Sequence, residues 1–449
     1  MTLSNEAVLQ TGAMDELVRE AVFGQGQTKD HAQWLLWEIG QVAGVKPASI
    51  HDLYLARGRG ETHGFTVPAI NVRSLSYDTA RAVFRTAVKQ RAGAFIVEIA
   101  RSEIAYTDQR PREYVAVMLA AALREGFRGP LFVQGDHFQV NAKKFAVDRR
   151  GEVAAVKQLA QEAIASGFFN IDVDTSTLVD ISLATLDEQQ RLNYQTAVDI
   201  ARYVREIEPD GVTISVGGEI GEVGAHNSTV PELRAFMDGF NKTLKERSGA
   251  VEGLSKISVQ TGTSHGGVVL ADGTIAEVKL DLKALEELSK VARDEYKLAG
   301  AVQHGASTLP DNAFNNFPRV EAAEIHLATN FQNILFDHMP DALRSRIYKW
   351  LDENAKEERK PKDTDEQFYY KTRKKALGPF KRDIWDMPDS VKGDLATAYD
   401  QTFGFLFEQL RVTNTADTVA RLVKAPSMHR APGAPVAVHA APDDAEAGE

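Results

Sequence analysis

The sequence contains no cysteine among its 449 residues. This absence excludes disulfide bonds, thiolate metal sites and cysteine nucleophiles. A metal ion, if the protein binds one, must therefore take histidine, aspartate or glutamate side chains as its ligands. The lack of cysteine also fits a reducing compartment.

The sequence also lacks long apolar runs and an excess of positive charge. No run approaches the ~18–20 apolar residues of a membrane span, and the N-terminal residues lack the basic-then-apolar pattern of a signal sequence. The 63 acidic residues outnumber the 52 basic ones, so the formal net charge is −11 and no global field attracts nucleic acid. A content of 43% hydrophobic residues excludes a wholly disordered chain. We therefore expect a cytoplasmic protein that binds neither membranes nor nucleic acid.

Short apolar runs alternate with long amphipathic stretches from Thr66 to about His338. The clearest amphipathic stretch covers residues 76–91, where apolar residues recur at helical spacing. The eight apolar runs that we predict to be strands are Thr66–Asn71, Ala94–Ile99, Pro130–Gln134, Phe168–Val173, Val212–Val216, Lys256–Gln260, Ala299–Gln303 and Ala323–Ala328.

Strands and helices that alternate in this number predict an α/β fold, the (β/α)8 TIM barrel. A doubly wound parallel sheet is the alternative, because periodicity does not report whether a sheet closes. The polar and titratable residues favour the barrel, since they cluster just after the strands, at the face where barrel enzymes place their chemistry.

Composition and periodicity divide the chain into four segments. Residues 1–60 are predicted to form an N-terminal helical extension, and residues 61–340 the barrel, which would be the catalytic domain. Residues 341–424 return to helical patterning and carry a basic patch, which predicts a C-terminal helical extension. Residues 425–449 are rich in alanine and proline and end in acidic residues. Because this composition cannot bury enough surface to offset the ordering entropy, we expect a disordered tail.

Three histidines follow predicted strands, and each lies beside glycine. His137 follows the third strand, His265 the sixth and His304 the seventh. The carboxyl ends of barrel strands surround one mouth, so we expect the three imidazoles to converge there. Three neutral imidazoles with an open coordination position suit a catalytic Zn²⁺ or a similar divalent cation. For each histidine taken alone, an ordinary polar loop residue is the alternative.

Carboxylates occupy the same predicted edge. Asp136 precedes the first of these histidines, Asp172 and Asp174 end the fourth strand, and Glu219 and Glu222 follow the fifth. A carboxylate next to a metal ligand can orient that ligand or transfer a proton to the bound substrate. The alternatives are strand-end capping for Asp172 and Asp174, and a solvated loop acid for Glu222.

The order and spacing of these residues resemble those of the class II, metal-dependent fructose-bisphosphate aldolases. The resemblance extends from about Val67 to Phe336 and, less closely, to Leu410. The segments that carry it are Val67–Val72, Gly135–His137 with Ala142–Lys144, Asp174–Leu178, Gly218–Gly221, Thr263–Gly266, His304–Ser307 and Ile325–Asn330.

The resemblance implies a metal site. Zn²⁺, or another divalent cation, would be held by His137, His265 and His304, with Glu219 and Asp174 near an alternative metal position. Such an ion polarises the ketose carbonyl and stabilises the enediolate that remains when the C3–C4 bond breaks.

The resemblance also implies catalytic and substrate-binding residues. Asp136 would transfer the proton at the cleaved carbinol, and Glu222, with His226 as the alternative, is the candidate for the base that the family carries on an acidic loop. The implied substrate-binding residues are Asn71, Gly266, Gly305, Ser307, Thr329, Asn330 and Arg382.

The phosphate-binding segments depart from the family pattern. After the third histidine the family usually has Gly-Gly-Ser-Gly, whereas Ala306 here adds a Cβ where the backbone must approach an anion closely. The Lys-Pro-Gly that commonly follows the second histidine is missing, and Asn330 replaces the usual aspartate. For Arg382, a solvated basic face is the alternative interpretation. The metal and enediolate machinery is therefore predicted to be present, and the sugar-phosphate clamp to be altered.

The leading hypothesis is a zinc-dependent aldolase, a lyase of carbohydrate metabolism acting in glycolysis or gluconeogenesis. It would reversibly cleave a ketose bisphosphate, first of all fructose 1,6-bisphosphate, into glycerone phosphate and glyceraldehyde 3-phosphate. Two alternatives stay open: a metal-dependent C4 epimerase of a ketose or keto-acid on the same barrel, and a non-catalytic aldolase-like subunit. We expect a small-molecule sugar phosphate as substrate and a homo-oligomeric protein.

Overall fold

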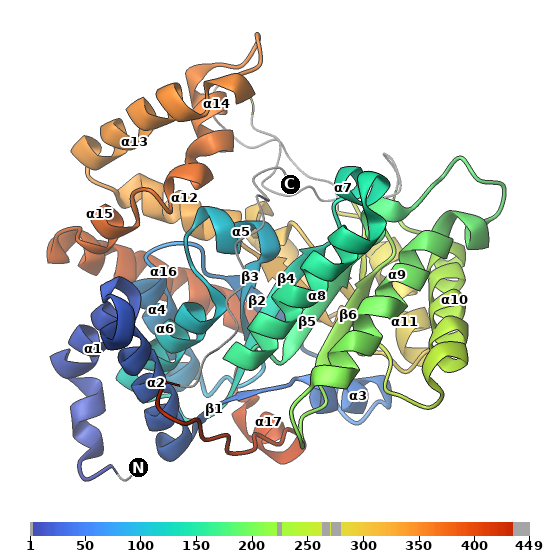
Figure 1. Ribbon diagram of the computed structural model, residues 1–449, viewed down its shortest axis with the longest axis horizontal. Helices are drawn as coiled ribbons and strands as arrows, with labels where there is room; N and C mark the ends of the chain where they lie inside the picture. The colour runs from blue at the N-terminus through green and yellow to red at the C-terminus, as the bar shows by residue number, and fades with distance from the viewer. Residues whose placement is uncertain (1–2, 222–226, 263–269, 271–279, 434–449) are drawn as a thin grey trace.

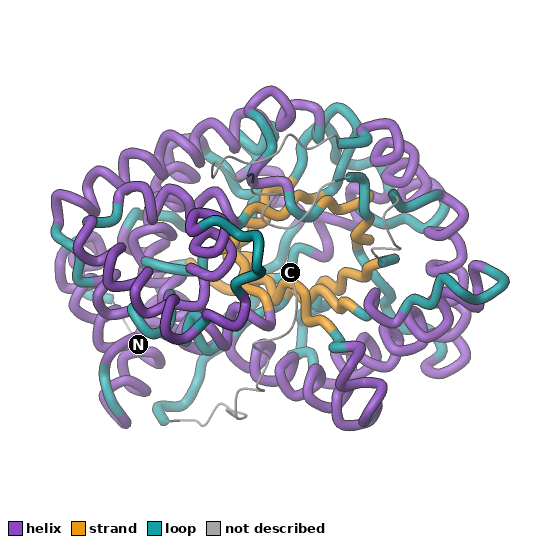
Figure 2. The backbone as a smooth tube through the Cα atoms, turned by 90° about the horizontal axis from the view of Figure 1, so that it is seen from above, coloured by secondary structure: helices purple, strands orange, loops and turns teal. Residues whose placement is uncertain are grey.

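The computed structural model describes residues 3–221, 227–262, 270 and 280–433. Its centre is a barrel of eight parallel strands with helices around it (Figures 1 and 2). The strand order is β1-β4-β3-β2-β9-β8-β7-β6-β5, and a further pairing of β4 with β5 closes the ring. This closure confirms the predicted TIM barrel and excludes the doubly wound sheet.

Each of the eight predicted apolar runs coincides with part of a barrel strand. The barrel strands are β2 (Val67–Asn71), β3 (Ile96–Ala100), β4 (Gly129–Gln139), β5 (Asn170–Asp174), β6 (Ser215–Glu219), β7 (Lys256–Val259), β8 (Ala301–Gln303) and β9 (Glu324–Leu327).

Amphipathic helices cover the outside of the barrel. In the first of them the apolar residues at helical spacing are buried, as predicted, except for Val88, which is exposed. The helices and short 3-10 turns between the barrel strands and directly after β9 are α4 (Ser76–Gln90), α5 (Arg101–Tyr106), α6 (Pro111–Arg124), α7 (Ala142–Val147), α8 (Arg149–Ser166), η2 (Ser176–Leu178), α9 (Leu186–Ile207), α10 (Val230–Ser248), α11 (Leu282–Asp294), η3 (Ala306–Thr308), η4 (Asp311–Asn316) and α12 (Thr329–His338).

The N-terminal segment consists of η1 (Glu6–Gln10), α1 (Gly12–Phe23), α2 (Gly26–Ala43), β1 (Val45–Ala48) and α3 (His51–Gly58). One helix of this segment, α3, closes the amino-terminal end of the barrel, and α1 and α2 pack against α6. Figure 1 places α3 at the end of the barrel opposite α5 and α7. From there the Tyr54 hydroxyl donates to the Glu324 carboxylate, and the Arg57 guanidinium donates to the carbonyl oxygens of Ala299 and Ala322, each at 3.1 Å.

The strand β1 is absent from the sequence predictions, which treated this region as helical. It pairs in parallel with the first residues of β4, from Val45 opposite Gly129 to Ala48 opposite Phe132. Because β1 is short and contains Pro47, and because its partner residues lie before the barrel part of β4, no local pattern marks it.

The C-terminal segment divides into a projecting part and a part that returns to the barrel. Its elements are α13 (Asp341–Asn354), η5 (Lys356–Glu358), α14 (Asp365–Thr372), η6 (Arg373–Ala376), α15 (Lys381–Trp385), α16 (Asp389–Gln409) and α17 (Ala416–Leu422). Helices α13 and α14 stand away from the barrel (Figure 1). Helix α16 packs against α4 and α12, where the rings of Phe331 and Phe403 lie 4.9 Å apart.

The beginning of the expected disordered tail is ordered in the structure. Residues 425–433 run along α2, where the indole N–H of Trp37 donates to the Met428 carbonyl oxygen at 2.6 Å. The Glu38 carboxylate accepts from the Arg430 backbone N–H at 2.7 Å. The composition of the tail did not predict this, because the polar groups that hold it belong to α2. Residues 434–449 lie outside the described residues.

Across the described part of the chain, we find no helix whose length and apolarity would allow it to span a lipid bilayer.

Candidate active site

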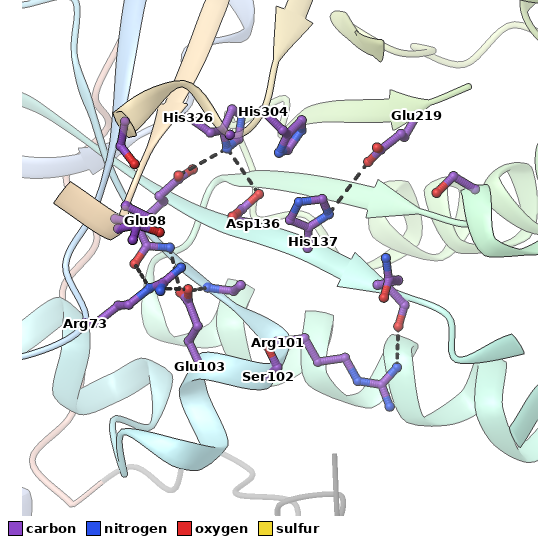
Figure 3. A pocket seen from close by; sticks show the side chains of 18 of the residues that line it. Arg73, Glu98, Arg101, Ser102, Glu103, Asp136, His137, Glu219, His304 and His326 are labelled. Carbon is purple, nitrogen blue, oxygen red and sulfur yellow. Dashed lines mark hydrogen bonds and ion pairs between the residues drawn. The ribbon is translucent and has the colours of Figure 1, made fainter. Parts of the chain in front are cut away.

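A pocket of about 230 Å³ opens at the carboxyl ends of the barrel strands (Figure 3). It lies where the sequence predicts the chemistry of a barrel enzyme. The predicted site residues that line it are Asn71, Asp136, His137, Glu219, His304, Gly305, Ser307 and Thr329.

A β-bulge in β4 turns two consecutive side chains into this pocket. The register of β4 against β5 shifts between Gly135 and Phe138, and His137 adopts a left-handed conformation with φ of +40°. In a regular strand neighbouring side chains point to opposite faces. Here both Asp136 and His137 line the pocket. A bulge and a positive φ at a non-glycine residue are typical of functional sites.

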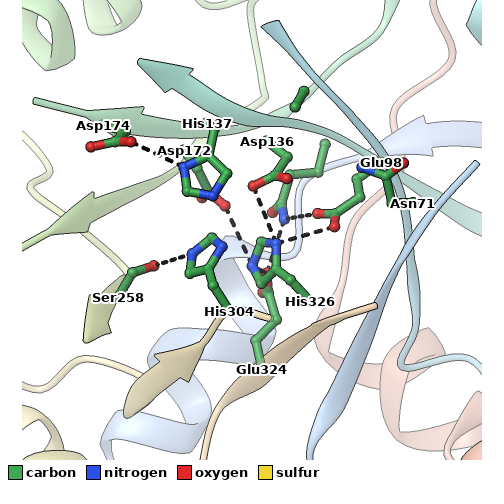
Figure 4. Close-up of polar contacts among 12 residues, drawn as sticks. Asn71, Glu98, Asp136, His137, Asp172, Asp174, Ser258, His304, Glu324 and His326 are labelled. Atoms are coloured by element: carbon green, nitrogen blue, oxygen red, sulfur yellow. Dashed lines mark hydrogen bonds and ion pairs between the residues drawn. The ribbon is translucent and has the colours of Figure 1, made fainter. Parts of the chain in front are cut away.

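Asp174 fixes the orientation of the His137 ring. Its Oδ2 lies 3.0 Å from His137 Nδ1 and accepts from the Gln139 amide at 2.6 Å, while its Oδ1 accepts from the Ser176 backbone N–H at 3.0 Å (Figure 4). Burial raises the pKa of Asp174, but its hydrogen bonds with His137 and Ser176 outweigh burial and bring the pKa below its usual range.

Negative charge surrounds His137. Burial lowers the pKa of its imidazole, but the charges of Asp136, Asp174 and Glu219 outweigh burial and hold the pKa well above its usual value. Glu219 Oε2 lies 3.7 Å from His137 Nδ1. Burial, followed by the charge of Asp174, raises the pKa of Glu219 to about 8.

The structure brings two of the three predicted histidine ligands together. The ring centroids of His137 and His304 are 4.3 Å apart, and Ser258 Oγ lies 3.0 Å from His304 Nε2. One donor atom from each of Asp136, His137 and His304 lies within 4.8 Å of the other two.

A second group of donor atoms fits the alternative metal position of the sequence analysis. Donor atoms of His137, Asp174 and Glu219 also lie within 4.8 Å of one another.

Beneath the mouth, the barrel interior holds a buried ion-pair network. Lys256 Nζ lies 2.9 Å from Asp172 Oδ1 and 2.6 Å from Glu324 Oε1, and it donates to the Gln134 amide oxygen at 2.7 Å. Gly217 makes room for this network, since a Cβ there would lie 2.3 Å from Asp172 Oδ1. Asp172, expected at the strand edge, is therefore part of the floor under the pocket.

The charged residues of the floor shift one another's pKa values. Burial lowers the pKa of Lys256, but the charges of Asp172 and Glu324 outweigh it and raise the pKa above its usual value, so the ammonium is not a nucleophile at neutral pH. Burial raises the pKa of Asp172 to about 6 despite the lysine. The pKa of Glu324 falls to about 2, because Lys256 and His326 outweigh the effect of burial.

His326, on β9, is the main site residue that sequence reasoning missed. Its ring is buried, stacks on His304 with centroids 4.0 Å apart, and faces four carboxylates (Figure 4). Nδ1 lies 3.1 Å from Glu98 Oε1 and 3.2 Å from Asp136 Oδ1, and Nε2 lies 2.8 Å from Glu324 Oε1.

A sequence signal for these interior residues existed. In β3, Glu98 interrupts an apolar run, and in β9 the polar residues Glu324 and His326 alternate with apolar ones. Residues two apart in a strand share a face, and in a barrel one face lines the interior. Charged residues at alternate positions of a strand that is otherwise apolar therefore predict a polar barrel interior.

Two arginines on the opposite wall of the pocket were also not predicted (Figure 3). Arg73 Nε lies 2.6 Å from Glu103 Oε1, and Arg101 Nη1 lies 2.7 Å from Glu152 Oε1. Among the pocket-lining residues that the structure describes, these two are the only arginines and there is no lysine. Each of the two is paired with a carboxylate.

Other predicted site residues do not line this pocket. Asn330 lines a neighbouring pocket with Phe331 and Phe405, although its backbone N–H donates to Ser307 Oγ at 3.4 Å. The Arg382 guanidinium lies over the Phe23 ring, 4.3 Å from its centroid, because α15 packs beside the N-terminal helices. Glu222, His226, His265 and Gly266 lie outside the described residues.

The protein is a (β/α)8 barrel whose C-terminal face carries a pocket lined by imidazoles and carboxylates. Barrel enzymes place their active sites at this face. Residues 58–381 match the family model of class II fructose-bisphosphate aldolases. The chain therefore belongs to the class II fructose-bisphosphate aldolase family.

Solved structures share the fold at low sequence identity. A Coccidioides immitis protein, named provisionally as a fructose-1,6-biphosphate aldolase, is 16% identical over 82% of this chain and 97% of its own, with a TM-score of 0.50. A Sinorhizobium meliloti 1021 protein, described as a probable tagatose 6-phosphate kinase, is 15% identical over 79% of this chain and 98% of its own, with a TM-score of 0.54.

A third solved structure is the fructuronate-tagaturonate epimerase UxaE from Cohnella laeviribosi. It is 12% identical over 78% of this chain and 82% of its own, with a TM-score of 0.54. At such identities the likeness establishes the fold alone. Among curated protein sequences, none matches this chain significantly.

Proposed function

We propose that this protein is a metal-dependent aldolase that reversibly cleaves a ketose bisphosphate, with fructose 1,6-bisphosphate as the first candidate. The products would be glycerone phosphate and glyceraldehyde 3-phosphate. The observation that carries the proposal is the convergence of Asp136, His137 and His304 at the barrel mouth, with donor atoms within 4.8 Å of one another. We place the reaction in the cytoplasm, as the composition suggests.

The donor set fits a divalent cation such as Zn²⁺. Its two imidazoles are ligands that Zn²⁺ takes when thiolates are absent, and the carboxylate beside them is the proposed proton-transfer group. Asp174 contacts one ring nitrogen of His137, and Ser258 contacts one ring nitrogen of His304. Metal-ligating histidines typically have such a partner on the nitrogen that does not bind the metal. We propose His137, His265 and His304 as the ligands. When bound, the ion polarises the ketose carbonyl and stabilises the negative charge that develops on its oxygen.

Asp136 is the proposed proton-transfer group at the C4 oxygen. In cleavage it takes the proton of the C4 hydroxyl, the new carbonyl forms there, and the electron pair of the C3–C4 bond stays with the C3 fragment. In condensation the same carboxyl returns the proton to the C4 oxygen. Asp136 is buried and lines the pocket beside His137, which supports this role. Glu222 stays the candidate for the second proton transfer, at C3.

Two groups of pocket residues would meet the substrate's anionic ends. Gly305, Ser307 and Thr329 form one group, and Gly305 has a positive φ of 67°, which frees the backbone to approach an anion. Arg73 and Arg101 form the other. Both arginines are already paired with glutamates, which reduces the positive charge that they offer to a bisphosphate.

A coupled assay tests the proposal. Protein loaded with Zn²⁺ and supplied with fructose 1,6-bisphosphate should release triose phosphates that a dehydrogenase detects through NADH oxidation. The His265→Ala variant should lose bound metal and activity together while its circular dichroism spectrum stays unchanged. Absence of triose phosphate from the metal-loaded wild type, across ketose mono- and bisphosphates, would show the aldolase proposal to be wrong.

A C4 epimerase of a ketose or keto-acid is the second candidate. The paired arginines favour it, since a substrate with one anionic group or none needs fewer cations than a bisphosphate. A barrel epimerase shares this fold. In this reaction the C3–C4 bond breaks and reforms on the opposite face without release of fragments. Carbon NMR of keto-acids and ketoses incubated with the metal-loaded protein distinguishes the two: inversion at C4 without triose formation supports the epimerase.

A further inference from the structure

His326 lies between the proposed proton-transfer group and the floor of the barrel. Its Nδ1 faces Asp136 Oδ1 at 3.2 Å and Glu98 Oε1 at 3.1 Å, and its Nε2 faces Glu324 Oε1 at 2.8 Å. The ring is buried, so water does not compete strongly for these contacts.

The floor that holds Nε2 is itself fixed from three directions. Glu324 accepts hydrogen bonds from Lys256 on β7 at 2.6 Å, from the Gln134 amide on β4 at 2.9 Å, and from the Tyr54 hydroxyl on α3. A carboxylate with this many donors has little freedom to move. The imidazole that leans on it is therefore also held in one place.

We propose that His326 is the positioning residue of Asp136, holding the carboxylate through Nδ1 in the orientation that proton transfer at the mouth requires. The inference rests on the proposed role of Asp136. Figure 4 shows the line of contacts from Glu324 through His326 to Asp136. In this arrangement the contacts that fix Glu324 also restrict His326, and His326 in turn restricts Asp136, which lines the open pocket.

A purely structural role for His326 is the alternative, in which the contact of Nε2 with Glu324 matters and the contact of Nδ1 does not. The stacking of His326 on His304 is expected in both cases and does not distinguish them. The two ring nitrogens therefore have to be tested separately.

Two substitutions separate them. In His326→Asn the amide nitrogen takes roughly the place of Nδ1, and in His326→Gln it takes roughly the place of Nε2. We expect His326→Asn to keep kcat within about threefold of wild type. We expect His326→Gln to lower kcat by roughly 10- to 100-fold, the usual cost of losing a partner behind a site residue. KM and zinc content should stay unchanged in both.

The opposite order, with His326→Gln active and His326→Asn impaired, would overturn the proposal, and so would equal losses in both variants. If His326→Gln does not fold, His326→Met fills a similar volume without a donor and carries the same expected loss. In an Asp136→Asn background, His326→Gln should have almost no further effect on kcat, because the group that it positions is no longer there.

Crystal structures of the two variants test the inference without activity. The Asp136 carboxylate should keep its place in His326→Asn and be displaced or mobile in His326→Gln. An unchanged Asp136 in His326→Gln would contradict the positioning role even if the wild type proves to be an epimerase. An inactive wild type with the expected displacement would contradict the proposed function and leave the positioning of Asp136 supported.

Discussion

At the scale of single residues, the site is organised by what holds each side chain. Asp174 holds His137, Ser258 holds His304, and His326 faces Asp136. Each contact limits the orientation of a group that would otherwise rotate, which is how a site reaches a defined geometry before substrate binds.

The first residue-scale prediction concerns Asp136. The Asp136→Ala variant should retain its metal, because the three proposed histidine ligands remain. It should lower kcat by roughly 10²–10⁴, the usual contribution of a general acid–base group. Steady-state kinetics on samples with measured zinc content test this, and full turnover in the variant would show that the assigned role is wrong.

The second residue-scale prediction concerns Asp174. The Asp174→Asn variant keeps the shape of the side chain but replaces the carboxylate that holds His137 Nδ1. We expect the affinity for Zn²⁺ to fall by roughly 10- to 100-fold, as measured by competition with a chromogenic chelator. Asp180→Asn is the matched control, since Asp180 accepts only local hydrogen bonds from Ser182 in an exposed loop. Equal affinities in both variants would exclude the orienting role.

At the scale of elements, short departures from regular strands build the site. The bulge in β4 brings Asp136 and His137 to the same pocket. In β6, Gly217 leaves the space in which Lys256 on β7 reaches Asp172 on β5. Both features are properties of the backbone, so a change of side-chain rotamer cannot replace them.

The first element-scale prediction concerns β6. In Gly217→Ala the new Cβ would lie 2.3 Å from Asp172 Oδ1 and 2.8 Å from Lys256 Cε, so the buried ion pair must shift. We expect the free energy of unfolding to fall by roughly 1–3 kcal/mol, the scale of overpacking in a core. Gly393→Ala on α16 is the control: no heavy atom lies within 4 Å of its Cβ, and stability should stay equal or rise slightly. Urea unfolding followed by fluorescence compares the two, and an unchanged Gly217→Ala would contradict this packing.

The second element-scale prediction concerns the segment along α2. Truncation after residue 424 removes the partners of Trp37 and Glu38 and should lower Tm by a few degrees. Truncation after residue 433 keeps these contacts and should leave Tm unchanged. Scanning calorimetry of the two truncated chains and the full chain decides it; identical Tm values in all three would show that the contacts contribute nothing.

At the scale of the whole molecule, the barrel carries a charged interior between a closed end and an open one. Helix α3 closes the amino-terminal end through Tyr54 and Arg57, and the pocket opens at the other. Four carboxylates face His326, and Lys256 pairs with two of them. Burial raises the pKa of Glu98 to about 7, with a further contribution from Asp136. Ionised Glu98 is thus disfavoured in the folded state.

The whole-molecule prediction follows from this imbalance. A carboxyl whose folded pKa is raised stabilises the fold below its ordinary pKa of 4.5, and this contribution is lost as pH rises through about 7. In metal-free protein, Glu98→Gln should therefore match wild type near pH 4.5 and exceed its stability at pH 8 by roughly 1–3 kcal/mol. Urea unfolding across this pH range tests the sign; a variant less stable than wild type at pH 8 would contradict it.

Sequence reasoning located the strands and much of the mouth, because apolar runs mark barrel strands and polar residues after them mark one face. It missed His326 and Lys256, since their charges lie inside strands and become meaningful only when the barrel closes. It also misplaced Arg382, because its position depends on how α15 packs against α1, which no local pattern encodes. The ordered start of the tail was missed for the same reason.

We propose that His137 and His304 bind one divalent cation at the barrel mouth together with His265. Anomalous diffraction from crystals grown with Zn²⁺, collected at the zinc absorption edge, tests it most directly. We predict a single strong peak within bonding distance of all three imidazoles and above Asp136. A peak at the floor among Glu98, Asp172 and Glu324, or no peak near His137 and His304, would contradict the account.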